Sequence, residues 1–199
     1  MRQRFEDNLA RVKHLVDIYA TLGGTGQGRR PVNSTDLLRA ATVFLHAAIE
    51  DLLRSMESTK LPAAAPAVLD GVPLVGLGPR PEKFFLGQLA PHRGSTVDDV
   101  IRRSVEAHLE RATYGNATEV RDTITQCGLD PAPAQPFLDS VNGLMRRRHH
   151  IVHQADREEV HGRGHHRARS LSRGQVQIWL DAARGFGDAL LNQLPNAGN

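Results

Sequence analysis

The residues best suited to chemistry lie in one segment near the carboxyl end, PFLDSVNGLMRRRHHIVHQAD, in which Arg148 is followed five positions later by His153. A histidine has a reference pKa of about 6.5, so it can remove a proton at neutral pH as a general base. A guanidinium keeps its charge and can stabilise negative charge that develops on a phosphate oxygen. One arginine and one histidine in the same cleft would therefore suffice for RNA cleavage without a metal ion.

A helix predicted over about residues 135–155 would position this pair. With residues placed at 100° intervals, one apolar sector contains Phe137, Val141, Leu144, Met145, Ile151, Val152 and Ala155. Arg148 falls in the middle of that sector, where a guanidinium is costly unless it is paired or faces a cleft or a partner. Arg146 and Arg147 point elsewhere and are expected to be solvated.

Spacing alone leaves two interpretations of Arg148. In the first, it forms a salt bridge with a buried acid such as Glu50, and the histidines are ordinary surface residues. In the second, Arg148 and His153 form a site for phosphate chemistry. The i, i+4 spacing of His149 and His153 could also hold a metal ion, but carboxylates are sparse beside them and the HExxH pattern is absent. We therefore expect neither a metal nor a cofactor.

Positive charge is concentrated around the same segment. The net charge of the 199 residues is only +3, yet residues 146–173 contain eight arginines against three carboxylates, and six of the ten histidines. Such clustering indicates a polyanionic partner, with RNA as the candidate. Residues 156–173 are predicted to form a basic loop whose arginines add affinity that weakens with salt. The candidate RNA-binding residues are Arg146, Arg147, Arg163, Arg167 and Arg169.

The remaining segments predict helices that would surround this one. Apolar spacing indicates helices over about residues 2–22, 33–58, 96–113, 116–127 and 172–194. The cluster Asn33–Asp36 and Thr96 are predicted N-caps. Alternating strand patterns are missing, so we predict an all-α, up-and-down bundle of four to six helices that forms a single domain over residues 1–199. An irregular excursion is expected at about 59–95, with a short helical turn near 84–89.

Composition excludes several other classes. The longest apolar runs are too short to span a membrane, and the first residues lack the apolar core of a signal peptide. The single cysteine, Cys127, excludes a disulfide framework. We therefore expect a cytoplasmic protein with no membrane partner.

Read as a motif, Arg148–His153 (RHHIVH) resembles that of the HEPN superfamily, an arginine followed by a polar residue, three further residues and a histidine. It is most similar to the branch called RiboL-PSP-HEPN, whose motif helix reads similarly through Ile-Val-His. His149 fills the polar position, where asparagine is commoner. LLRAATVFLHAAIEDLLRSM resembles the central, acidic-ended helix of the family, and GQVQIWLDAARGFGDALL resembles its terminal helix. The resemblance covers about residues 3–194.

This resemblance implies a homodimer in which the two motif helices face each other, and metal-independent endoribonuclease activity. The ribose 2′-OH would attack the adjacent phosphate, leaving a 2′,3′-cyclic phosphate and a 5′-OH. His153 would be the acid/base and Arg148 would stabilise the phosphate. His149 would orient the site, and Glu50 would position Arg148. A two-fold cleft would also explain an arginine on an apolar face.

Many members of the superfamily are toxins or defence nucleases, which suggests a toxin–antitoxin or phage-defence setting with an antitoxin or defence protein as partner. Other members keep the fold without catalysis. The alternative expectation is therefore an inactive RNA- or nucleotide-binding module, or a dimeric interaction module. In a purely structural domain, Arg148 would pair internally with Glu50.

Overall fold

The computed structural model describes residues 1–22, 32–75, 85–154, 156 and 169–195. Within these ranges every regular element is helical, which confirms the predicted all-α bundle. The α-helices are α1 (Arg2–Leu22), α2 (Val32–Lys60), α3 (Pro66–Leu69), α4 (Val97–Leu109), α5 (Ala117–Gln126), α6 (Gln135–Gln154) and α7 (Arg173–Leu191). Short 3-10 helices are η1 (Leu61–Ala63), η2 (Leu86–His92) and η3 (Ala132–Ala134).

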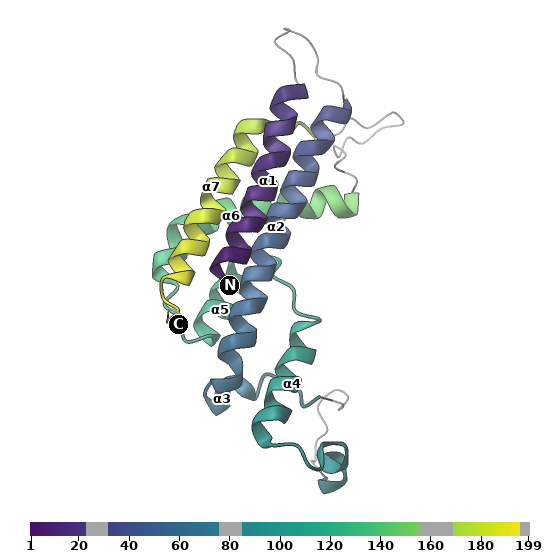
Figure 1. Ribbon diagram of the computed structural model, residues 1–199, viewed down its shortest axis with the longest axis vertical. Coiled ribbons are helices and arrows are strands. Elements are labelled where there is room, and N and C mark those ends of the chain that lie inside the picture. Colours follow the sequence, from purple (N-terminus) through teal and green to yellow (C-terminus); the bar gives the residue numbers. More distant parts are fainter. Residues whose placement is uncertain (23–31, 76–84, 155, 157–168, 196–199) are drawn as a thin grey trace.

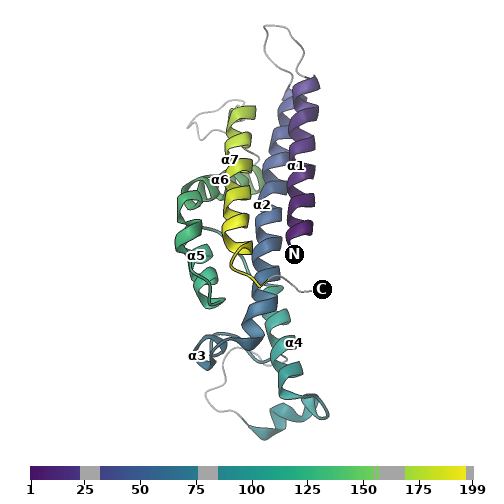
Figure 2. The ribbon, with the colours of Figure 1, turned by 60° about the vertical axis from the view of Figure 1, so that its left-hand side comes forward.

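Helices α1, α2 and α7 run side by side along the long axis of the molecule, and α6 runs across them (Figure 1, Figure 2). The apolar stripe of α1 that the spacing predicts, including Leu9, Val12 and Val16, is fully buried against its neighbours. The broad apolar face of α2 is buried as well, because α1, α6 and α7 all pack on this helix. Its buried residues include Leu38, Leu45, Ile49, Leu52, Leu53 and Met56.

Two glycines allow α7 to pack closely. A Cβ at Gly187 would lie 2.1 Å from the ring of Phe5 in α1, and one at Gly185 would lie 2.3 Å from the ring of Phe137 in α6. Each aromatic ring therefore occupies the space that a side chain would need. The cost of glycine within a helix is offset by this contact between helices.

Thr96 caps its helix as predicted, and Asn116 and Ser172 cap two further helices near their predicted starts. Thr96, Asn116 and Ser172 have extended backbones, and each side chain accepts a hydrogen bond from the first turn of the following helix. The prediction for Asn33–Asp36 is wrong, since α2 already begins at Val32. A capping residue needs a non-helical backbone, and these four residues lie inside the helix.

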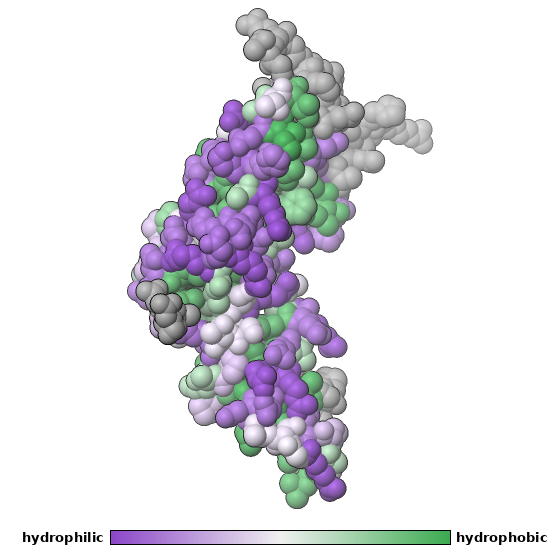
Figure 3. Space-filling model, in the orientation of Figure 1, coloured by the Kyte–Doolittle hydropathy of each residue, from purple (hydrophilic) through white to green (hydrophobic). Residues whose placement is uncertain are grey.

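The far end of α2 carries a second, smaller cluster. There Leu61, Val105 and Leu109 are buried together where η1 and α4 meet α2. The predicted excursion contains η1, α3 and η2, whereas residues 76–84 lie outside the described ranges. η2 forms near the expected helical turn, and Phe85 and Leu86 are exposed there. Figure 3 shows apolar surface at the lower tip of the molecule.

None of the described helices is long and apolar enough to cross a membrane.

Candidate functional site

Arg148 lies where α6 leaves the core. The apolar face of α6 is buried at Val141, Leu144 and Met145. One turn beyond Arg148, however, Val152 is 49% exposed. Arg148 itself is half-buried, and its Nε is shielded from solvent without a hydrogen-bond partner among the described residues. A shielded guanidinium nitrogen without a hydrogen-bond partner costs free energy, so its presence needs an explanation.

The ion pair between Arg148 and Glu50 that spacing allowed does not form between these two described residues. Glu50 instead lies one helical turn after His46 on α2, with its Oε2 3.7 Å from Nδ1 of that histidine. Burial lowers the pKa of His46, the Glu50 carboxylate raises it, and the charges of Arg148 and Arg54 lower it further. His46 therefore lies within the electrostatic reach of both Arg148 and Glu50, and its position on the apolar face of α2 did not mark it as a site residue.

The two histidines expected beside Arg148 form a pair on the surface. The ring centroids of His149 and His153 are 4.7 Å apart, and both side chains are exposed. His150 turns to another side of the helix, where Nδ1 shares a hydrogen bond with Gln154. No described hydrogen bond joins His153 to Arg148.

Arg147 corrects the sequence prediction. It was expected to be solvated, but its side chain is only 14% exposed, and Nη2 lies 2.8 Å from Oδ2 of Asp156. The same nitrogen donates to the carbonyls of Arg169 and Ser170. Burial lowers the pKa of the Arg147 guanidinium, and the neighbouring Asp156 carboxylate opposes that effect. The helical wheel placed Arg147 correctly off the core face but could not show the chain segment that covers it.

Asp156, which was expected at the start of a solvated loop, is buried and 1% exposed. Its Oδ2 also accepts a hydrogen bond from Nε of Arg39 on α2, at 2.8 Å. Its backbone, at a φ of 54°, donates to His150 and accepts from Arg169. Aspartate tolerates this left-handed conformation better than most residues. One carboxylate thus joins α2, the end of α6 and the segment before α7.

Three of the five predicted RNA-binding arginines come together. Arg146, Arg147 and Arg169 line a groove of about 910 Å³ between α6 and the start of α7, and His150 also lines it. Arg163 and Arg167 lie outside the described residues. On α6, Arg148 and the groove residues lie on opposite sides of the helix, so the structure separates the expected site residues into two faces.

A buried polar group away from α6 was not predicted. The hydroxyl of Tyr114 donates to the carboxylate of Glu57, and both residues are buried. Burial raises the pKa of Glu57 and that of Tyr114. The nearby Cys127 thiol has its pKa raised to about 12, chiefly by burial, so it is a poor nucleophile at neutral pH.

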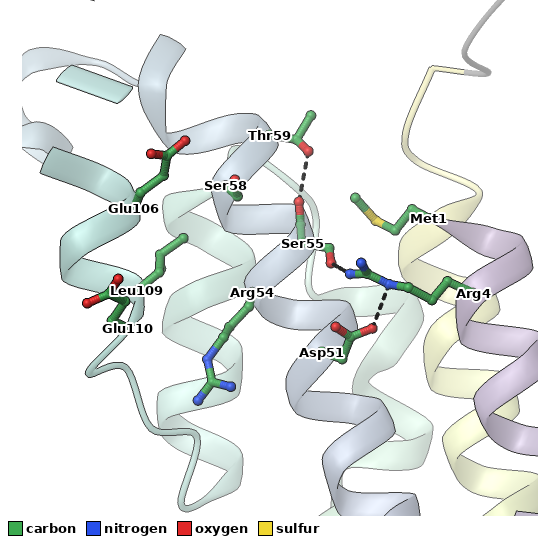
Figure 4. A pocket seen from close by; sticks show the side chains of 10 residues that line it. All are labelled: Met1, Arg4, Asp51, Arg54, Ser55, Ser58, Thr59, Glu106, Leu109 and Glu110. Carbon is green, nitrogen blue, oxygen red and sulfur yellow. Dashed lines mark hydrogen bonds and ion pairs between the residues drawn. The ribbon is translucent and has the colours of Figure 1, made fainter. Parts of the chain in front are cut away.

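Residues from the start of α1, the end of α2 and α4 line a cavity of about 680 Å³ (Figure 4). Arg4 contributes an ion pair with Asp51 at 2.9 Å and a hydrogen bond to Ser55. Glu106 and Glu110 of α4 lie on the opposite wall. No predicted site residue lines this cavity.

Within the described ranges, histidine, cysteine and carboxylate side chains form no group of three that could hold a metal ion. His161, His165 and His166 lie outside those ranges. Comparison of the chain with protein-family models, with curated proteins and with solved structures finds no match.

Proposed function

We propose that this protein is a metal-independent endoribonuclease of the HEPN type, in which Arg148 and His153 act on RNA. The observation that carries the proposal is the position of Arg148, which is half-buried without an ion pair to a described carboxylate at the point where α6 emerges from the core. An arginine with a purely structural role would be expected to have an internal partner, as Arg147 does. The exposed pair His149 and His153 lies within two turns of Arg148 on the same helix.

The chemistry requires one proton acceptor and one fixed positive charge. His153 would remove the proton from the ribose 2′-OH, and the 2′ oxygen would form a bond to the adjacent phosphorus. The bond from phosphorus to the 5′ oxygen would break, and that oxygen would take up a proton from water or imidazolium to give a 5′-OH and a 2′,3′-cyclic phosphate. Arg148 would stabilise the charge on the phosphate oxygens, with His149 orienting His153.

A homodimer through α6 is part of this proposal. Val152 on α6 and Phe44 on α2 are 49% and 57% exposed, although both continue apolar faces. Figure 3 shows apolar surface at the upper right edge, beside the upper part of α2. Pairing of two such surfaces would enclose Arg148 in a two-fold cleft. Glu50, which lies against His46 near Arg148, would help to position the guanidinium.

A nuclease of this kind would act in the cytoplasm, as a toxin or phage-defence effector held in check by an antitoxin or another defence protein. It would need no cofactor.

The direct test is cleavage of total cellular RNA by purified protein in excess EDTA. The parental protein should cut RNA and leave cyclic phosphate ends, whereas His153→Ala and Arg148→Ala should not. His108→Ala, which changes an exposed histidine on α4, is the matched control and should cut at the parental rate. Parental activity in His153→Ala would show that the assigned acid/base is wrong.

The same samples test the dimer. Sedimentation should give a two-chain mass for the parental protein and a one-chain mass for Phe44→Asp, with loss of cleavage in that variant. A monomeric parental protein that still cleaves RNA would contradict the two-fold site.

The second candidate function is RNA binding without turnover, and the arginine-lined groove favours it. Folded, dimeric protein that binds RNA but releases no cyclic phosphate would support this binding module over the nuclease.

A further inference from the structure

The groove between α6 and α7 is lined by an aromatic side chain as well as by arginines. The aromatic residue is Trp179 of α7, and Gly143 of α6 lines the groove beside it. A Cβ built on Gly143 would be 3.5 Å from the indole Nε1 of Trp179, an ordinary van der Waals contact. The absence of a side chain at Gly143 therefore leaves the edge of the indole that carries the N–H open to the groove.

Trp179 is only 8% exposed, and its indole N–H has no hydrogen-bond partner among the described residues, yet Nε1 is not among the nitrogens that are fully shielded from solvent. The N–H is therefore open on the groove side. A tryptophan that is buried except at its N–H can use that group to bind an acceptor from outside the fold. Glycine inside a helix is unfavourable, and no packing contact requires it at this position. Together, Gly143 and Trp179 point to a ligand that supplies an acceptor.

Most of the other polar side chains that line the groove can donate hydrogen bonds to a ligand. Arg146 is exposed on one wall, and Arg169 contributes to the other. Ser172 and Gln175 line the groove at the start of α7, whose first turn contains no acidic side chain. Asp139 is the single carboxylate among the lining residues. Donors, positive charge and a helix start favour an anion with several oxygens.

The flat faces of the indole are not available to a ligand, because Trp179 packs within the main core cluster. Stacking of a base on this ring is therefore not expected, and only the N–H edge can contribute. Recognition would be directed at phosphate and ribose oxygens and would not depend on the base sequence.

We infer that this groove is a subsite for the sugar–phosphate backbone of RNA, on the side of α6 away from Arg148. Arg146 and Arg169 hold phosphate, and the indole N–H of Trp179 donates to a phosphate or ribose oxygen. The exposed histidines His149 and His153 lie between the two faces of the helix, so one strand can reach them and the groove. The inference rests on the proposed function in that RNA is taken as the ligand.

The chain contains one tryptophan, so its fluorescence reports directly on the groove. His153→Ala protein, which should not cut its ligand, would be titrated with a short single-stranded RNA. Binding should change the fluorescence of Trp179. Gly143→Ala, which favours the helix but covers the N–H, should weaken binding several-fold, as should Arg146→Gln. Arg11→Gln, which changes an exposed arginine on α1, is the matched control and should bind like the parent.

Salt dependence gives an independent readout. Removal of one phosphate contact should reduce the slope of log affinity against log salt by about 0.7 for single-stranded RNA. Arg146→Gln should show this reduction, and Gly143→Ala should keep the parental slope. RNA affinity that is unchanged in both groove variants would overturn the inference.

Inorganic phosphate and a nucleoside monophosphate serve as competing probes. Both should bind far more weakly than RNA, and equal affinity would overturn the inference in favour of a site for small phosphates. Cleavage by the parental protein is measured separately. Groove binding without cleavage would reject the proposed function alone, whereas cleavage with groove variants that bind normally would reject the subsite alone.

Discussion

The carboxylate of Asp156 lies 2.8 Å from the guanidinium of Arg147 and also 2.8 Å from that of Arg39, in a part of the chain that its composition predicts to be solvated. This arrangement separates two neighbouring arginines on α6. Nε is shielded without a partner in both residues, but the Nη2 of Arg147 pairs with Asp156, whereas Arg148 forms no ion pair with a described carboxylate. Adjacent arginines thus differ in their pairing, and substitutions can test whether they also differ in role.

Asp156→Asn should lower the free energy of unfolding by about 3–5 kcal/mol, because the largely buried Arg147 loses its counter-charge and Arg39 keeps only its exposed partner Asp36. Asparagine also tolerates the left-handed backbone, so the change removes charge without adding strain. Urea denaturation would measure the loss. Asp139→Asn, at an exposed position on α6, should have little effect, and equal stability of the two variants would refute a structural role for Asp156.

Arg148→Met should leave the free energy of unfolding unchanged or higher, because an apolar side chain of similar length replaces a shielded charge. The same substitution should abolish RNA cleavage. Arg147→Met is the matched comparison and should cost roughly 3 kcal/mol through its partner Asp156. If Arg148→Met proved as destabilising as Arg147→Met, Arg148 would be a structural residue.

Stability should depend on pH through His46. Burial lowers the pKa of this residue from 6.5, with Arg148 and Arg54 acting in the same direction, while Glu50 and the Tyr114 backbone oppose them. The unfolded chain therefore binds the proton more tightly than the folded chain does. His46 thus makes the free energy of unfolding fall as the pH drops below about 6.5. Above that pH, His46 is neutral in both states and does not lower stability.

His46→Gln should reduce that dependence between about pH 7 and pH 5, as followed by thermal unfolding. His108→Gln, at an exposed position, should retain the parental slope. A slope unaltered by His46→Gln would show that other groups dominate the acid response.

Tyr114→Phe should destabilise the fold by about 1–3 kcal/mol, because the buried Glu57 carboxyl loses its donor. The raised pKa of Glu57 means that the folded state favours the protonated acid, so stability from this group falls as pH rises above about 4.5. The cost of Tyr114→Phe should therefore grow with pH. In a Glu57→Gln background the cost of Tyr114→Phe should shrink. A double-mutant cycle that gives no coupling energy between the two residues would contradict this prediction.

Sequence alone determined the helices and most of their starts. Apolar spacing over α1, α6 and α7 and the caps Thr96 and Ser172 act over one or two turns, so these features are encoded within a few neighbouring residues. The same spacing showed that Arg148 occupies an apolar face. Local periodicity also indicated, correctly, that Arg147 lies off that face.

Tertiary structure decided which charges are paired. Arg39 and Asp156 are separated by 117 positions, and Trp179 meets Gly143 only because α7 packs on α6. A helical wheel shows which side of one helix a residue faces but not which distant segment covers it. Burial and pairing depend on that covering segment, so the burial of Asp156, the charges around His46 and the groove between α6 and α7 emerged only from the packed helices.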